Sequence, residues 1–141
     1  MYTDQVTSQD KALCHLFFHC CYKDGEFKKA EVLTVSDTLV NAGLHKNMNF
    51  KDEIIEYQQY QQEITDEKSY LQYLLQLIQP ANELALYSYC TELCLSDSEL
   101  SVPEEHLLTE IGNQLGLAES QQEIVKKLMA QRKVVETQKL F

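Results

Sequence analysis

The chain has 141 residues, which is short enough for one domain over residues 1–141 and long enough to bury a core without disulfide or metal support. Only two prolines and four glycines interrupt it, which favours long helices over many short strands. The formal net charge of −10 repels nucleic-acid phosphates and anionic lipid. The charge is compatible with cations or with a protein partner that has a basic surface. We therefore predict no nucleic acid among its partners.

The sequence carries no sign of secretion or membrane insertion. The polar stretch from Met1 to Lys11 lacks the apolar run of a signal peptide, and no apolar stretch approaches the roughly 20 residues that a membrane span needs. The five cysteines are an odd number, which favours free thiols in a reducing compartment. These features together predict a cytoplasmic protein.

Apolar residues recur at helical spacing along the whole chain, and no segment alternates with a period of two. The pattern predicts an all-α fold of about seven helices, over about residues 8–23, 29–41, 50–64, 65–78, 80–95, 101–115 and 120–137. Pro80 suits the first turn of the fifth helix, where no backbone donor is needed. Ser101 with Glu104, and Ser120 with Glu123, have the spacing of capping boxes.

The same spacing predicts which side chains are buried. In the second helix we expect a buried face of Val32, Leu33, Val35, Leu39 and Val40. In the fifth helix, we expect Leu84, Leu86, Tyr87, Cys90, Leu93 and Cys94 to be buried, and in the last helix Ile124, Val125, Leu128, Met129 and Val135. Tyrosines on helices commonly lie at the rim of a core with a wet hydroxyl, and this is our prediction for Tyr60, Tyr70 and Tyr73.

Two segments of the chain repeat each other without a gap. Residues 13–44 align with residues 86–117 at an offset of 73, and the matches fall where a helix stops, turns and starts again. Asp24 meets Asp97, and Glu31 meets Glu104. We infer two helical hairpins of like design, packed face to face about a rough two-fold axis, because neither can bury its apolar face alone. The helices of residues 50–78 would then close over one side.

At these residues the chain resembles the TerB-like family, which includes the tellurite-resistance protein TerB and the N-terminal domain of DjlA-type co-chaperones. The matching motifs are Asp24-Gly25-Glu26-Phe27 with Glu31, and Asp97-Ser98-Glu99-Leu100 with Glu104. The second motif departs from the pattern at Ser98, where the family usually has Gly. The resemblance covers roughly residues 10–118. It implies an all-helical domain of two similar halves, clustered acidic residues as candidates for metal binding, and a role in stress or tellurite response.

The repeated acidic residues have two interpretations. In the first, Asp24, Glu31, Asp97 and Glu104 converge and bind a hard divalent ion such as calcium, magnesium or manganese through carboxylate oxygens. In the second, they cap helices and turns: Glu104 would accept from the backbone at Ser101, and the aspartates would satisfy turn amides. Capping explains Glu31 less well, because Lys28 is a poor cap. An EF-hand loop is excluded, since the twelfth loop position holds Val35 or Leu108 in place of Glu.

His15 and His19 are four residues apart, as are Cys90 and Cys94, and either spacing can bind zinc. The repeat places the two cysteines on the buried face, whereas the histidines lie about 200° from it around the same helix. We therefore predict different surroundings for the two pairs and no shared zinc site. Cys14, Cys20 and Cys21 are thiols that can bind tellurium species, but core packing is the simpler role for them.

Three functions follow from these patterns. The first is a non-enzymatic TerB-like domain of the stress or tellurite response whose acidic patch binds a divalent metal ion. The second is a protein-interaction module in which the repeated carboxylates only cap helices. The third is a metal-dependent hydrolase, which needs water-activating ligands, a general base and a cleft beside the acidic residues. We expect no catalytic residues and no cofactor other than such a metal ion.

Overall fold

The computed structural model describes residues 1–23, 29–43, 48–95 and 99–141. Eight helices and no strand occur in these ranges, which confirms the all-α prediction. In chain order the helices are α1 (Tyr2–Gln5), α2 (Gln9–Tyr22), α3 (Lys29–Asn41), α4 (Phe50–Gln61), α5 (Glu67–Ile78), α6 (Glu83–Cys94), α7 (Val102–Gln114) and α8 (Glu119–Thr137). The short helix α1 was not predicted, because four residues are too few to show a helical period.

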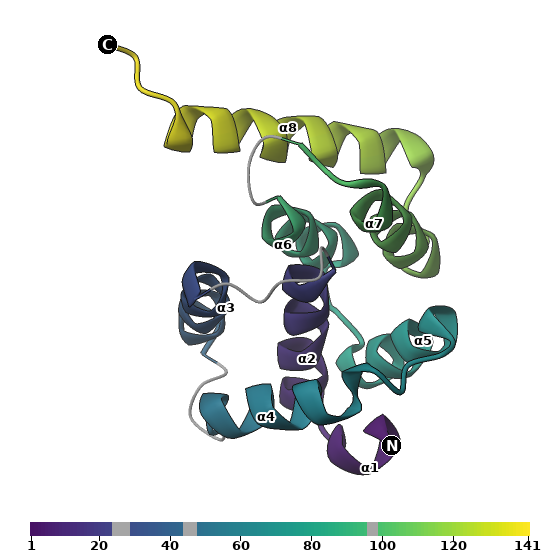
Figure 1. The fold of residues 1–141 in the computed structure, drawn as a ribbon. Coiled ribbons are helices and arrows are strands. Elements are labelled where there is room, and N and C mark those ends of the chain that lie inside the picture. Colours follow the sequence, from purple (N-terminus) through teal and green to yellow (C-terminus); the bar gives the residue numbers. More distant parts are fainter. Residues whose placement is uncertain (24–28, 44–47, 96–98) are drawn as a thin grey trace.

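Helix α2 lies at the centre of the fold and packs against α3, α4, α5 and α6 (Figure 1). The two repeated segments are the pairs α2–α3 and α6–α7, and they meet where α2 packs on α6. Helices α4 and α5 cover α2 on the sides that α3 and α6 leave free, as predicted for residues 50–78. Helix α8 then lies across α6 and α7 at the far end. This arrangement surrounds α2 and buries every side chain from Cys14 to Cys21.

Side chains cap several helices, and the cap of α7 is the capping box predicted from the sequence. Ser8 and Asn49 cap α2 and α4, and Ser101 forms a complete capping box with Glu104 at α7. Two other predictions were wrong. Pro80 precedes α6, which begins at Glu83, because the Asn82 side chain accepts from a backbone N–H and provides the cap. Helix α8 begins at Glu119, and its cap residue is Ala118, two residues before the predicted cap Ser120. The reason is that the side chain of Gln121 accepts from the backbone N–H of Ala118 at 3.0 Å.

The helices at the edge of the fold bury less than their sequences predict. In α3, Val35 and Leu39 are buried, but Leu33 and Val40 are exposed. Leu84 in α6 is also exposed, whereas the other side chains predicted for that face are buried. In α8 the predicted face splits: Val125 is buried and Met129 half-buried, while Ile124, Leu128 and Val135 are exposed. Helix α3 packs on α2 and α6, and α8 packs on α6 and α7, so the faces of α3 and α8 that point away from these neighbours stay exposed.

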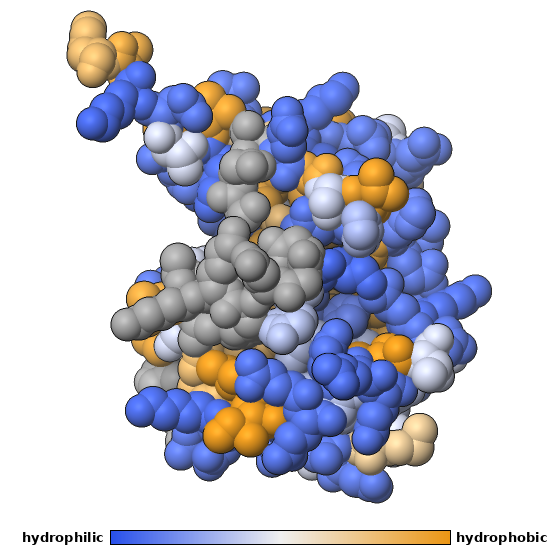
Figure 2. Space-filling model, viewed as in Figure 1, coloured by the Kyte–Doolittle hydropathy of each residue, from blue (hydrophilic) through white to orange (hydrophobic). Residues whose placement is uncertain are grey.

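The face of the molecule seen in Figure 2 is mainly hydrophilic, with separate hydrophobic patches. No helix in the described part of the chain is both long enough and apolar enough to span a membrane. All five cysteines are buried, and the Cys94 thiol of α6 donates to the backbone carbonyl of Cys20 in α2 at 3.7 Å. Their burial agrees with the packing role that the sequence predicts.

Candidate functional site

One face of α2 carries four basic side chains at intervals of one helical turn: Lys11, His15, His19 and Lys23. Both histidines are buried, with exposed fractions of 0% for His15 and 5% for His19. Carboxylates and tyrosines of α4 and α5 face them. The helix spacing therefore places two polar clusters side by side in the interior, one around each histidine.

The first cluster is centred on His15. Its Nε2 lies 2.8 Å from Oε1 of Glu53, and its Nδ1 lies 2.6 Å from the hydroxyl of Tyr60. The Tyr60 hydroxyl in turn lies 2.6 Å from that of Tyr70. Tyr2 in α1 packs edge-on against the Tyr70 ring, with 4.9 Å between the ring centroids. A hydrogen-bonded chain thus runs from Glu53 through His15 into a group of tyrosines that α1 covers.

Burial keeps the imidazole of His15 neutral. It lowers the pKa of His15 from 6.5 to about 4, against the opposing attraction of Glu56. A neutral imidazole has one N–H, which Nε2 donates to the Glu53 carboxylate, so that Nδ1 accepts from Tyr60. Burial also raises the pKa of Glu53, whose residue is only 4% exposed. The ammonium group of Lys11 lies near this buried carboxyl group, with Nζ 3.7 Å from Oε2 of Glu53.

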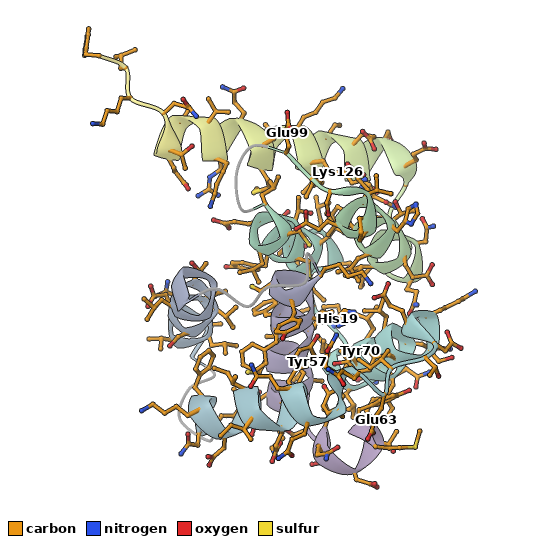
Figure 3. The ribbon with its side chains drawn as sticks, in the orientation of Figure 1. His19, Tyr57, Glu63, Tyr70, Glu99 and Lys126 are labelled. Atoms are coloured by element: carbon orange, nitrogen blue, oxygen red, sulfur yellow. The ribbon has the colours of Figure 1, made fainter. Side chains whose placement is uncertain are left out.

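The second cluster is centred on His19 (Figure 3). Its Nε2 lies 2.8 Å from Oε2 of Glu67, and its Nδ1 lies 2.8 Å from the hydroxyl of Tyr57. Lys23 donates to the same Glu67 oxygen. His19, Tyr57 and Tyr70 come together where α2, α4 and α5 meet. Here every charge has a hydrogen-bonded partner.

The two clusters differ in their balance of charge. Around His19, the single carboxylate Glu67 is offset by the ammonium group of Lys23. Around His15, two carboxylates, Glu53 and Glu56, face the single ammonium group of Lys11. One Glu56 oxygen, Oε2, is buried and has no hydrogen-bond donor among the residues that the structure describes. The first cluster therefore has one carboxylate more than its cations neutralise.

Three donor atoms of the first cluster are close enough to share a metal ion. One atom each from His15, Glu53 and Glu56 all lie within 4.8 Å of one another. In a tetrahedral zinc site with bonds of about 2.0–2.2 Å, the ligand atoms are about 3.4 Å apart. Small side-chain adjustments would bring the three atoms to that spacing. The described part of the chain contains no other group of three or more histidine, cysteine or acidic side chains that meets this criterion.

The predicted acidic site is described only in part. Asp24 and Asp97 lie outside the described residues, and the side chain of Glu31 in α3 is likewise not described. Glu104 is buried, and its Oε1 accepts from the backbone N–H of Ser101 at 2.8 Å. This is the hydrogen bond that the capping interpretation predicts. The convergence of the four acidic residues on a metal ion stays a prediction.

The role of the histidines was not predicted, and the prediction for two of the tyrosines was wrong. His15 and His19 each lie within hydrogen-bond distance of a different glutamate, Glu53 and Glu67. Tyr60 and Tyr70 are fully buried with bonded hydroxyls, so their prediction as wet rim residues was wrong. Tyr73 is half-buried, and its hydroxyl donates to the carbonyl of Val6 at 2.6 Å.

One signal in the sequence points to these clusters. The Lys-x₃-His-x₃-His-x₃-Lys series places four polar side chains on one helix face, where carboxylates or hydroxyls of a neighbouring helix can pair with them. In α4 the residues Glu53, Glu56, Tyr57 and Tyr60 recur at helical spacing and provide that cover.

Comparison with known families gives one match. The family model described as "Tellurite resistance protein TerB" matches residues 10–127, which include both histidine clusters and most of the fold. Comparisons with curated proteins and with solved structures each found no significant match. The match covers more than half of the chain and agrees with its all-helical architecture, and the chain therefore belongs to the TerB family.

Proposed function

We propose that this chain is a non-enzymatic TerB-family domain of the tellurite or stress response that binds a divalent transition-metal ion through His15, Glu53 and Glu56. The observation that carries the proposal is the unmatched carboxylate beside His15. The oxygen Oε2 of Glu56 is buried without a hydrogen-bond donor in the described structure, and the ammonium group of Lys11 lies 3.9 Å from it, beyond hydrogen-bond distance. A bound cation would contact this oxygen directly.

The donor set favours manganese or zinc over calcium and magnesium. Calcium and magnesium take oxygen ligands almost exclusively, whereas an imidazole nitrogen beside carboxylates suits first-row transition ions. If Nε2 of His15 held a metal ion, the single ring proton would lie on Nδ1, from which it could be donated to the Tyr60 hydroxyl 2.6 Å away. Tyr60 would thus hold the imidazole in the orientation that binding requires.

Burial supports a binding role in preference to catalysis. His15 is fully buried and Glu53 nearly so, while the Glu56 side chain is 32% exposed. An ion held there would reach solvent beside the partly exposed side chains of Glu56 and Lys11, and the buried side chains of His15 and Glu53 leave little room for a substrate. The cytoplasmic location and the link to tellurite belong to this proposal as well, and the family description supports the latter.

Isothermal titration calorimetry with Mn²⁺ and with Zn²⁺ tests the proposal. We expect one site per chain in the natural protein and binding weakened at least about tenfold in Glu56→Gln, which keeps the shape of the side chain and removes its charge. Glu67→Gln is the matched control, because Glu67 occupies the corresponding place in the His19 cluster. The proposal fails if neither ion binds at millimolar concentration, or if both variants bind like the natural protein.

The protein-interaction module is the second candidate. The capping hydrogen bond of Glu104 favours it for that residue, since a carboxylate that caps α7 needs no metal ion. In that case the acidic surface would bind a basic protein partner without any ion. The variant Glu104→Gln tests this candidate. If Glu104 only caps α7, the variant should be less stable, and its calorimetric titrations with Mn²⁺ and Zn²⁺ should be unchanged.

A further inference from the structure

Lys11 lies between the two carboxylates of the His15 cluster without a hydrogen bond to either. Its Nζ is 3.7 Å from Oε2 of Glu53 and 3.9 Å from Oε2 of Glu56. Both distances exceed those of a hydrogen bond, so the ammonium group acts here as a point charge. Lys11 stands one helical turn before His15 on the same face of α2. Its charge is therefore close to the position that a metal ion would take.

The corresponding lysine of the other cluster behaves differently. Lys23 donates directly to the Glu67 oxygen that also accepts from His19. The Glu67 carboxylate thus accepts hydrogen bonds from both of its donors, and the charge of Lys23 offsets the charge of Glu67. Lys11 faces two carboxylates and makes no such contact, and its side chain is 30% exposed. It can therefore move to solvent without breaking a hydrogen bond.

We propose that Lys11 is a tethered cation that competes with the metal ion for Glu53 and Glu56 and thereby sets the affinity of the site. This inference rests on the proposed metal-binding function. A divalent ion bound to both carboxylates would lie within a few ångströms of the ammonium group, and the two positive charges would repel each other. Metal binding must therefore displace Lys11, and the ion pairs that Lys11 loses reduce the observed affinity.

The test compares Lys11→Met with Lys23→Met in calorimetric titrations with Mn²⁺ and Zn²⁺. Methionine keeps much of the length of the side chain and removes the charge. Because Lys11 is half-buried and its ion pairs are long, we expect about tenfold tighter binding in Lys11→Met. Lys23→Met should bind within about twofold of the natural protein, since twelve residues of helix put Lys23 about 18 Å from Lys11, beyond the Debye length. Circular dichroism melts establish that both variants are folded.

The outcomes separate this inference from the function on which it rests. Equal binding by the natural protein and Lys11→Met overturns the competition and leaves the metal site standing. Equal tightening in both lysine variants also overturns it, because the effect would then be one of net charge. Binding by Lys11→Met alone upholds the competition and overturns metal binding as the function of the natural chain. Failure of all three proteins to bind overturns both proposals.

Discussion

Glu67 should make the stability of the protein depend on pH between about 4.5 and 2. Burial raises the pKa of this carboxyl, but hydrogen bonds from His19 and Lys23 outweigh burial and hold the pKa at about 2, against an ordinary value of 4.5. The Glu67 carboxyl is therefore protonated at a lower pH in the folded state than in the unfolded state. The stabilisation is complete above pH 4.5 and is lost as the pH falls from there toward 2.

The size of the effect follows from the difference between the two pKa values. A difference of about 2.5 corresponds to at most about 3.4 kcal/mol of unfolding free energy. The Glu67 side chain is 28% exposed, so solvent screens its ion pair with Lys23. We therefore expect a contribution of about 1–2 kcal/mol at neutral pH.

Urea unfolding of the natural protein and of Glu67→Gln from pH 6 to pH 3 measures this contribution. Glutamine keeps the shape of the side chain and cannot titrate. The difference in unfolding free energy between the two proteins should fall by about half over this range. Glu63→Gln, at an exposed position without an ion pair in the described structure, is the control and should show no such trend. A difference for Glu67→Gln that stays constant with pH would contradict the assignment.

Two further predictions concern buried polar groups. Tyr60→Phe should lower the unfolding free energy by about 1–3 kcal/mol, because it leaves the buried Nδ1 of His15 without a donor. Tyr87→Phe should change it by less than about 0.5 kcal/mol, because the buried Tyr87 hydroxyl has no partner in the described structure. Urea unfolding measures both variants, and equal losses of unfolding free energy would refute the hydrogen-bond argument. Gly112→Ala should lower the unfolding free energy by about 1–3 kcal/mol, because the new Cβ would lie 2.4 Å from the buried side chain of Gln122. A thermal melt unchanged from that of the natural protein would contradict this packing.

The helices and the repeat could be predicted from the sequence because both depend on local spacing. Apolar periodicity located seven of the eight helices, and the ungapped repeat identified the pairs α2–α3 and α6–α7. Side chains on the outer helices were less predictable. Ile124, Leu128 and Val135 have the spacing of a buried face, but α8 rests on α6 and α7 along one side and leaves them exposed. The burial of side chains in α8 depends on how much of the helix surface α6 and α7 cover, and the apolar periodicity of the sequence does not encode that.

The candidate site could not be predicted, because its residues meet only through tertiary packing. Glu53 and His15 are 38 residues apart, and no local motif connects them. The sequence instead drew attention to the repeated acidic motif, whose conspicuous spacing is also what helix capping requires, as Glu104 illustrates. The burial of Tyr60 is equally hard to predict, since its hydroxyl is bonded by His15, which is 45 residues away in the sequence.

The central claim is that His15, Glu53 and Glu56 bind a divalent transition-metal ion. A crystal structure of the zinc-loaded protein, with an anomalous difference map at the zinc edge, tests it most directly. The account predicts a peak within about 2.0–2.2 Å of Nε2 of His15 and of an oxygen of each glutamate. A map without a peak at His15, or with its peak at the repeated acidic motif, would contradict it.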